Sequence, residues 1–232
     1  MARFLVIAAA SGIGQATVSL LKAAGHEVFT TARDPSKITP DAVLDATDFE
    51  AVERVFQQAG AIAGVVNCSG SLLLKAAHLT SKAQYQATID ASLTTAFATV
   101  RAAGKYMKNG GSVVLVSSAA AMTGLANHEA IAAAKAGIIG LTLSAATSYA
   151  GNQLRVNAVA PGLTETPLTQ SLTANESARQ FSEAMHALGR LGQPADIARA
   201  IVFLLDPTNS WITGQVLAVD GGLSRVRPRM KA

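Results

Sequence analysis

The residues best placed to do chemistry lie in the alanine-rich stretch from Ala130 to Lys135. Ile131 precedes Lys135 by four positions, and residues four apart share one face of a helix. A tyrosine and a lysine at this spacing would bring a phenol and an ammonium into one site, where a proton could move. Isoleucine neither donates nor accepts a proton. The stretch therefore predicts a site with a cation and no neighbouring acid.

A glycine-containing turn near the N-terminus suggests a second site. The apolar run 4–8 leads into Ala8-Ala9-Ala10-Ser11-Gly12-Ile13-Gly14. Glycines where a strand enters a helix let the backbone approach a pyrophosphate, whose charge is favoured by the helix N-terminus. We expect Ser11, Gly12, Ile13 and Gly14 to contact the phosphates of a dinucleotide. A plain strand-to-helix turn is the alternative.

The end of the second apolar run carries information on the cofactor. It reads Thr30-Thr31-Ala32-Arg33, with no acid before Asp34. An acid at this place binds the 2′-hydroxyl of NAD, whereas an arginine suits the 2′-phosphate of NADP. Thr31 and Arg33 therefore favour NADP(H), with NAD(H) as the weaker choice. Arg33 as an ordinary loop cation is the alternative.

Strand-like and helical patterns alternate along the whole chain. Strands are predicted at 4–8, 27–31, 62–66, 112–116, 154–159 and 216–219, and helices at 12–24, 49–58, 81–107 and 128–150, the last with Asn127 as its N-cap. Strands this apolar indicate a parallel sheet covered on both faces. The predicted fold is α/β: a doubly wound, Rossmann-type parallel sheet in three layers, forming a single domain over 1–223. Ligands would bind beyond the carboxyl ends of its strands.

The net charge of +4 comes from a basic tail over 224–232. The tail holds Arg225, Arg227, Arg229 and Lys231 and no acid, which leaves 15 basic and 15 acidic residues in the body of the chain. A basic tail can bind an anionic surface. No basic stripe or aromatic platform accompanies it, so we predict a solvated terminus and no nucleic-acid partner.

Cysteine and histidine usage limits the other possibilities. Cys68 is the single cysteine, which excludes an internal disulfide and suits a reducing compartment. The four histidines lack metal-ligand spacing, so no metal site is predicted. The apolar start resembles a signal peptide but reads better as a buried strand, and no segment is a convincing membrane span. We expect a cytoplasmic protein without a membrane partner.

Later motifs resemble those of the short-chain dehydrogenase/reductase family, in order and over nearly the whole chain. They are Asp45-Ala46-Thr47-Asp48, Asn67-Cys68-Ser69-Gly70, the run 155–162, Arg190-Leu191-Gly192-Gln193-Pro194, Thr213-Gly214-Gln215 and Val219-Asp220-Gly221-Gly222. The glycine turn departs from the family pattern Thr-Gly-x-x-x-Gly-x-Gly, because Ile7 and Ala8 stand at its first two positions. Ala8 fits there if its φ is negative. Its methyl group predicts a tighter turn and weaker cofactor binding.

The resemblance implies hydride transfer between NADP(H) and a carbonyl or alcohol substrate. Ser118, thirteen residues before position 131, matches the serine that polarises the carbonyl, and Lys135 matches the lysine that holds the nicotinamide ribose. Ile131 replaces the family's tyrosine, and Ser92 replaces its asparagine. Further cofactor contacts are implied at Asp45, Ala46, Asn67, Ser69, Gly70, Pro161, Gly162, Thr164 and Thr166.

Few residues could replace the missing phenol. His128 lies in the same helix stripe, three residues before Ile131, and the helix N-terminus would keep its imidazole neutral. We favour the alternative that His128 is a solvent-facing first-turn residue. Ser118 could relay a proton through water, although an unassisted serine is a weak acid.

The segment 167–191 covers the substrate in the family. Here its apolar residues indicate an apolar cover and substrate, or else core or subunit contacts: Leu168, Leu172, Phe181, Met185 and Leu188. The family often forms oligomers, so the resemblance implies a homodimer or homotetramer.

Two functional hypotheses follow from the changed positions. The first is an NADP-dependent oxidoreductase whose proton donor is nonstandard or comes from water or substrate. The second is a catalytically inactive NADP-binding sensor, scaffold or partner subunit. A different reaction on the same scaffold is a third, less favoured reading.

Overall fold

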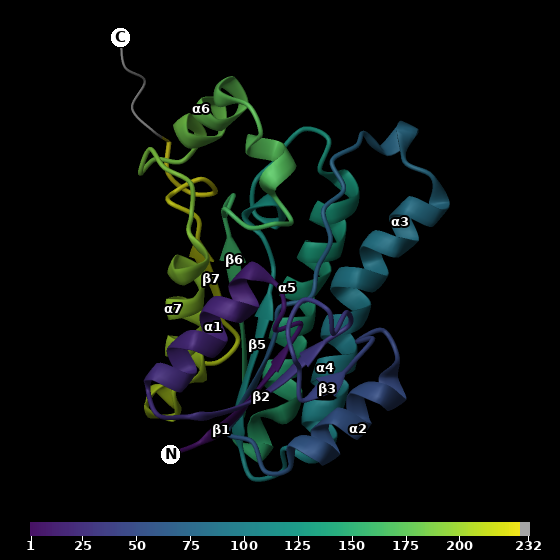
Figure 1. Ribbon diagram of the computed structural model, residues 1–232, viewed down its shortest axis with the longest axis vertical. Helices are drawn as coiled ribbons and strands as arrows, with labels where there is room; N and C mark the ends of the chain where they lie inside the picture. Colours follow the sequence, from purple (N-terminus) through teal and green to yellow (C-terminus); the bar gives the residue numbers. More distant parts are fainter. Residues whose placement is uncertain (228–232) are drawn as a thin grey trace.

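A seven-stranded parallel sheet forms the middle layer of the protein, and the computed structural model describes residues 1–227 (Figure 1). The strands are β1 Arg3–Ile7, β2 Glu27–Ala32, β3 Ala42–Val43, β4 Gly64–Asn67, β5 Gly111–Val116, β6 Leu154–Pro161 and β7 Val216–Val219. Their order is β3-β2-β1-β4-β5-β6-β7. Strand order reverses between β1 and β4, which places a ligand crevice beyond their carboxyl ends. The predicted doubly wound Rossmann-type fold is confirmed; the two-residue β3 was not predicted.

Helices cover both faces of the sheet, because successive strand residues point to opposite sides. Leu5, Val65 and Leu115 belong to the core on one face, under α2 Phe49–Ala59, α4 Thr95–Tyr106 and α5 Glu129–Tyr149. Phe4 and Val66 belong to the core on the other, under α1 Gly12–Ala23 and α7 Pro194–Leu205. Figure 1 shows these two groups of helices on opposite sides of the strands.

The helical run predicted over 81–107 contains a π-helical turn. The order is α3 Lys82–Ile89, the π turn Asp90–Thr94, then α4. The hydroxyl of Thr94 donates to Asp90 Oδ1 at 3.0 Å, and that of Thr95 donates to the Ser92 carbonyl at 3.0 Å. Hydroxyls that compete for helix carbonyls disturb the regular ladder. The turn lies at Ser92, and such turns are frequent at functional sites.

The start of α5 differs from the prediction. Asn127 has φ of 64° and His128 is the N-cap, without a side-chain cap bond. The Asn127 carbonyl accepts instead from the Lys75 amide at 2.7 Å, which fixes the preceding loop. By length and composition the helix Glu129–Asn152 could cross a membrane, a test that core helices also pass. Its packing on the sheet accounts for its apolar composition.

The C-terminal third adds a layer over the carboxyl edge of the sheet. Helix α6 Glu176–Met185 lies at the end of the molecule toward which the strands point (Figure 1). It is exposed on most of its surface, with no buried residue. Of the basic tail, Arg225 and Arg227 fall in turn or irregular backbone, whereas Arg229 and Lys231 lie outside the described residues.

Candidate active site at the carboxyl edge of the sheet

The glycine turn is built as the sequence predicts, with Ser11 as its organiser. Ser11 Oγ caps α1 by accepting from the Gly14 amide at 3.1 Å, and it donates to the Ala8 carbonyl at 2.8 Å. A Cβ at Gly14 would lie 2.6 Å from the Ala8 oxygen, so this position requires glycine. A Cβ at Gly12 would lie 3.0 Å from Thr166 Cγ2. The turn thus lies against Thr166, which follows β6.

Ala8 does not have the negative φ that would let it fit without strain. Its φ is +58°, in the left-handed region where a Cβ crowds the following carbonyl. The conformation persists because its carbonyl accepts from both the amide and the hydroxyl of Ser11, at 3.0 and 2.8 Å. The condition under which Ala8 would fit without strain, a negative φ, is therefore not met. Ala8 thus adopts the left-handed backbone conformation that a glycine would adopt at this position.

The end of β2 presents an unsatisfied hydroxyl and an exposed cation. Thr31 is fully buried, and its Oγ1 has no hydrogen-bond partner among the described residues. Arg33 is exposed, and it lowers the pKa of Asp45, after the larger effects of the Thr47 amide and hydroxyl on that carboxyl. Asp45 accepts from the Thr47 amide at 3.0 Å. Ala46 beside it is 8% exposed.

Asn67 acts inside the fold rather than toward a ligand. Its amide donates to Thr99 Oγ1 at 2.9 Å, and its oxygen accepts from the Ser69 amide at 2.8 Å. Both ends of the side chain are thus used to shape the loop after β4. Gly70 follows in that loop, where a Cβ would lie 3.3 Å from Lys135 Nζ. The predicted Asn67–Gly70 motif and the lysine are therefore brought together.

Lys135 is a buried cation at the carboxyl ends of β4 and β5. Its side chain is 6% exposed, and its Nζ donates to the Val116 carbonyl at 2.7 Å. The Ser117 hydroxyl donates to the Lys135 carbonyl at 2.8 Å, which ties α5 to the end of β5. Burial lowers the pKa of Lys135 from 10.5 to about 8, against a small opposing effect of Cys68. Burial also raises the pKa of the Cys68 thiol from 9.0 to about 12.

Ser118 leaves the sheet two residues after Val116. Its Oγ accepts from the Ala120 amide at 3.1 Å, so the hydroxyl hydrogen remains available to a ligand. Ile131, one helical turn before Lys135, is 4% exposed. Ser92 is 1% exposed, and its Oγ has no partner among the described residues. The predicted serine and lysine occupy one edge of the sheet, with an apolar side chain on the lysine's helix face.

Sequence reasoning missed the histidine that closes the other side of the site. His186 is 3% exposed; its Nε2 accepts from the Leu163 amide at 3.2 Å, and its Nδ1 contacts the Ser182 carbonyl at 2.7 Å. A Cβ at Gly162 would lie 2.8 Å from His186 Nε2. The loop holding Pro161, Gly162 and Thr164 therefore needs both this glycine and this histidine. A lone histidine between apolar residues gave no signal of this role.

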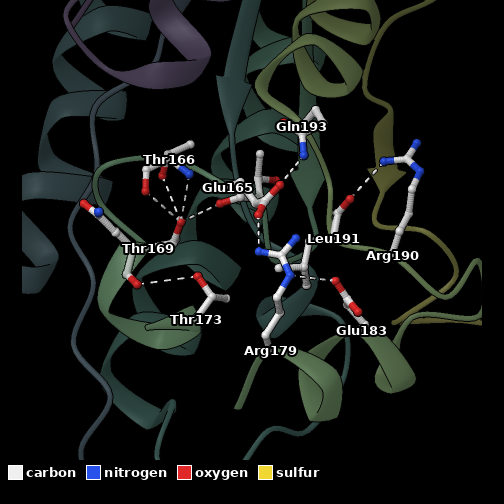
Figure 2. A network of polar contacts seen from close by, with 11 residues as sticks. Glu165, Thr166, Thr169, Thr173, Arg179, Glu183, Arg190, Leu191 and Gln193 are labelled. Atoms are coloured by element: carbon white, nitrogen blue, oxygen red, sulfur yellow. Dashed lines mark hydrogen bonds and ion pairs between the residues drawn. The ribbon is translucent and has the colours of Figure 1, made fainter. Parts of the chain in front are cut away.

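The cover is anchored by polar contacts (Figure 2). Glu165 pairs with Arg179 of α6 at 2.5 Å and also accepts from Gln193. Arg179 bonds Glu183 at 3.0 Å on the same helix. The Arg179 guanidinium, and then Gln193, hold the pKa of Glu165 below its usual range. Figure 2 shows Arg179 between the two carboxylates. The anchor joins the cover to the turn that carries Thr164 and Thr166.

The apolar residues predicted to form the cover lie largely on its surface. Leu168, Phe181 and Leu188 are 53, 70 and 72% exposed, whereas Leu172 and Met185 are half-buried. Thr166 is held by Thr169, whose hydroxyl lies 3.1 Å from both its amide and its hydroxyl. The cover is thus attached firmly at its base and exposes apolar side chains beyond it.

His128, weighed from sequence as a substitute proton donor, lies at the N-cap of α5 and is half-buried. Its Nδ1 contacts the Ala126 carbonyl at 2.8 Å, two residues away. Within residues 1–227, no group of three or more His, Cys, Asp or Glu side chains could hold a metal ion.

A Rossmann-type sheet with a serine and a buried lysine at its carboxyl edge defines a class, and sequence comparison gives the same class. The chain belongs to the short-chain dehydrogenase/reductase family: the profile described as "Enoyl-(Acyl carrier protein) reductase" matches residues 7–224. The 3-oxoacyl-[acyl-carrier-protein] reductase FabG of Thermotoga maritima is 37% identical, over 94% of this chain and 96% of its own length.

Solved structures agree with this assignment. A short-chain type dehydrogenase/reductase from Mycobacterium ulcerans has a TM-score of 0.90 at 28% identity, covering 98% of this chain and 91% of that one. ElxO with NADP bound has a TM-score of 0.88 at 26% identity, covering 96% and 99%. A variant of ElxO with a tyrosine replaced by phenylalanine is also solved with NADPH bound, at the same TM-score.

Proposed function

We propose that the protein is an NADP(H)-dependent oxidoreductase acting on a small apolar carbonyl or alcohol compound, with a proton donor other than tyrosine. In this proposal Ile131 occupies the family's tyrosine position and Ser92 its asparagine position. The observation that carries it is the buried Lys135, whose Nζ bonds the Val116 carbonyl two residues before Ser118 at the end of β5. The Ser118 hydroxyl hydrogen, left free by the Ala120 contact, would supply the donor that carbonyl chemistry needs there.

The residues present fit a phosphorylated dinucleotide. The Ser11–Gly14 turn would hold the pyrophosphate, because its amides and the start of α1 face that side. Thr31 Oγ1, buried without a partner among residues 1–227, and Arg33 would take the 2′-phosphate of NADP. Asp45 and Ala46 would flank the adenine. The NADP-bound and NADPH-bound ElxO structures support this choice over NAD.

The nicotinamide end of the cofactor would lie between Lys135 on one side and the loop after β6 on the other. Lys135 would hold the ribose hydroxyls, near Ser69 and Gly70. Pro161, Gly162, Thr164 and Thr166 would face the carboxamide, and Ile13 and Asn67 would support the loops around it. The contact of Gly12 with Thr166 Cγ2 joins the phosphate and carboxamide sides and supports a single continuous site.

The chemistry divides between cofactor and protein. A bound dihydronicotinamide supplies a hydride to the carbonyl carbon. Ser118 donates its free hydroxyl hydrogen to the carbonyl oxygen and stabilises the charge that develops there. Its oxygen is held by the Ala120 amide, so this orientation costs no rearrangement during the reaction. The proton that completes the alcohol must come from a group other than position 131.

A second candidate function is a catalytically inactive NADP-binding sensor, scaffold or partner subunit. The observation that favours it is that Ile131 and Ser92 both depart from the family's proton-relay residues. General acid–base catalysis contributes about 10²–10⁴ in rate, so a site with no replacement acid would be nearly silent. Cofactor binding would survive, because none of the phosphate contacts involves either residue.

Cellular context and assembly are part of the same proposal. We place the protein in the cytoplasm, as a homodimer or homotetramer with neither nucleic-acid nor membrane partners. Exposed apolar residues support subunit contacts: Phe97 and Leu143 on α4 and α5, and Phe203 and Trp211 near α7 are 48, 53, 48 and 99% exposed. The single domain would end near 223, with the basic segment 224–232 as a solvated tail.

Titration of the purified protein with NADPH and NADH, followed by nicotinamide fluorescence and calorimetry, tests the cofactor assignment. Micromolar affinity for NADPH, with much weaker NADH binding, is the expected result. Consumption of NADPH with a panel of apolar ketones and aldehydes then separates the two functions. Turnover that falls further in Ser118→Ala supports the oxidoreductase. Tight NADPH binding without turnover of any carbonyl supports the inactive binder, and failure to bind either nucleotide rejects both.

A further inference from the structure

We propose that the ammonium group of Lys135 is itself the proton donor to the substrate oxygen. This inference rests on the proposed oxidoreductase function and deepens it, because it names the group that replaces the phenol. Lys135 would then have two tasks, holding the ribose and delivering the proton.

The position of Nζ allows this second task. Among the described residues, its hydrogen-bond acceptor is the Val116 carbonyl, 2.7 Å away. An ammonium carries three hydrogens, so two remain for a ligand. Val116 stands two residues before Ser118, and a Cβ at Gly70 would lie 3.3 Å from Nζ, so the glycine leaves space beside the amine. The amine is therefore held at the end of β5, the strand that Ser118 follows.

The surroundings of Nζ make it a better acid than an ordinary lysine. Lys135 has no carboxylate partner among the described residues; the titratable side chain acting on it is Cys68, a thiol at the end of β4. Burial lowers the pKa of Lys135 to about 8, near the pH at which a general acid is most effective. A free lysine, at about 10.4, would hold its proton too strongly.

The other nearby groups are poorer donors. The pKa of Cys68 is raised to about 12 by burial, so its thiol gives up a proton reluctantly at neutral pH. His128 is bonded to the loop at Ala126, at the N-terminal end of α5. Ser118 is a weak acid without a base beside it. Lys135 is the one of these groups whose acidity and position agree.

Ser92 supplies a polar group for restoring the proton. Its buried hydroxyl has no partner among the described residues, and a buried polar group of this kind is commonly satisfied by water. The next residue, Leu93, packs against α5 at Gly137, where a Cβ would lie 2.7 Å from Leu93 Cδ2. The π turn therefore holds Ser92 beside the helix that carries Lys135.

The proposed step balances. Reduction needs a hydride at the carbonyl carbon and a proton at the oxygen, with the dihydronicotinamide as the two-electron reductant. An N–H bond of Lys135 breaks, and an O–H bond forms with the electron pair that leaves the carbonyl π bond. The amine is left neutral and takes a proton from solvent. In alcohol oxidation the neutral amine acts as the base.

The first test measures the acidity of Lys135 without turnover. The apoprotein is labelled with trace acetic anhydride from pH 6 to 11, with an acetyl-lysine amide standard, and the Lys135 peptide is quantified by mass spectrometry. Only a neutral amine reacts. We expect the labelling rate of Lys135 to reach half of the value for the fully deprotonated amine near pH 8. A midpoint in the ordinary lysine range overturns the proposal.

The second test separates the acid from the positive charge. Lys135→Arg keeps a cation and hydrogen-bond donors for the ribose, but its guanidinium does not deprotonate. Lys82→Arg, at an exposed lysine on α3, is the matched control. We expect Lys135→Arg to bind NADPH within about fivefold of wild type and to lose roughly 100-fold or more in kcat. The wild-type fall in kcat as pH rises through about 8 should also disappear.

The outcomes distinguish the two proposals. Wild-type turnover that persists in Lys135→Arg within about threefold overturns the lysine role and leaves the oxidoreductase standing. A wild-type kcat for reduction that does not change as pH rises through 8 also overturns the lysine role and leaves the oxidoreductase standing. Wild type that binds NADPH and reduces nothing overturns both. Lys135→Met serves as a second variant: it should lose turnover to the same extent as Lys135→Arg.

Discussion

Arg179 of α6 and Glu165 of the turn after β6 form an ion pair at 2.5 Å, which joins the cover to the cofactor side of the site (Figure 2). Glu165 lies between Thr164 and Thr166 in sequence, so the ion pair fixes α6 beside both threonines. The carboxylate is also held by Gln193, which precedes α7. Three segments therefore meet at this one side chain.

Replacing Arg179 should loosen the cover. Arg179→Met keeps the length of the side chain and removes its bonds to Glu165 and Glu183. Partly exposed pairs of this kind contribute about 0.2–1 kcal/mol each, so cleavage within 167–190 by a broad-specificity protease that does not require arginine should speed up about two- to fivefold. Arg199→Met, at a residue whose contact with Asp196 is 3.7 Å long, is the control. Equal cleavage of the two variants would contradict the anchor.

Restoring glycine at position 8 should relieve strain in the phosphate turn. With φ at +58°, alanine there costs about 1–2 kcal/mol relative to an unstrained backbone, partly offset by the greater freedom of glycine when unfolded. Ala8→Gly should therefore leave stability unchanged or slightly raised, and removing the methyl group from the phosphate turn should tighten NADPH binding about two- to fivefold. Urea unfolding measures the first, calorimetry the second.

Ala10→Gly is the matched control in the same turn. Ala10 is absent from the described positive-φ positions, so glycine gains nothing there and loses chain entropy. It should leave affinity unchanged and lower the unfolding free energy by about 0.5–1 kcal/mol. A similar gain in affinity from both variants would show that flexibility, and not the left-handed φ, limits binding.

Arg33 should decide between the two nicotinamide cofactors. Its side chain is exposed two residues after Thr31, whose buried hydroxyl has no partner among the described residues, and a charge-assisted bond contributes about 1.5–3 kcal/mol. Arg33→Ala should therefore weaken NADPH by roughly 10- to 100-fold and leave NADH binding nearly unchanged. Lys37→Ala, at another exposed cation of the same loop, should affect neither by more than about twofold. An equal loss for both cofactors in Arg33→Ala would argue against a 2′-phosphate contact.

The periodic parts of the fold were predictable from sequence, and the local exceptions were not. Apolar strands such as Phe4 to Ile7 alternate with helices in a pattern that specifies a doubly wound sheet, whereas Ser118 and Lys135 were predicted from the family resemblance. The φ of Ala8 could not be read from its residue type, which normally avoids that region. Its value depends on the Ser11 contacts that close the turn.

The long-range polar pairs could not be predicted from the sequence either. His186 meets Leu163 across 23 residues, and Arg179 meets Glu165 across 14. Neither spacing has a helical or strand period, so no pattern marks the partners. The burial of Lys135, which sets its acidity, likewise depends on β4, β5 and α5 meeting in space. Residue types indicated which groups could take part in proton transfer, whereas the packing of the fold determined the pKa of Lys135.

Placing a phenol at position 131 should raise turnover. Ile131→Tyr adds an acid on the face of α5 that carries Lys135, and carbonyl reduction should speed up about 10- to 100-fold, within the range of acid–base catalysis. Ile131 is 4% exposed, so the larger ring should cost about 1–3 kcal/mol of stability. Ile131→Phe adds the same ring without the hydroxyl and should gain nothing. A gain in both variants would mean that ring packing, not acidity, had changed the rate.

Removing the buried charge of Lys135 should stabilise the protein in a pH-dependent way. Its pKa falls from 10.5 when free to about 8 when folded, so between these values the unfolded chain binds more protons and stability rises with pH. Below pH 8 the full cost of burying the ammonium is present, on the order of 3 kcal/mol. Losing the hydrogen bond to Val116 lowers the free energy of unfolding by about 1 kcal/mol. Lys135→Met should therefore be more stable than wild type by about 1–3 kcal/mol at pH 7.

Urea unfolding of wild type and Lys135→Met at several pH values from 7 to 9.5 measures this difference. The difference in unfolding free energy between Lys135→Met and wild type should narrow as pH rises above 8, because Lys135 of the wild type then loses its proton and its charge. Cys68 acts in the opposite direction above pH 9: its pKa is raised to about 12, so the folded state then binds more protons and loses stability. That contribution is present in both proteins and largely cancels in the comparison. A gap that stays constant from pH 7 to 9.5 would mean that Lys135 keeps its proton throughout, and that its burial does not make it an acid.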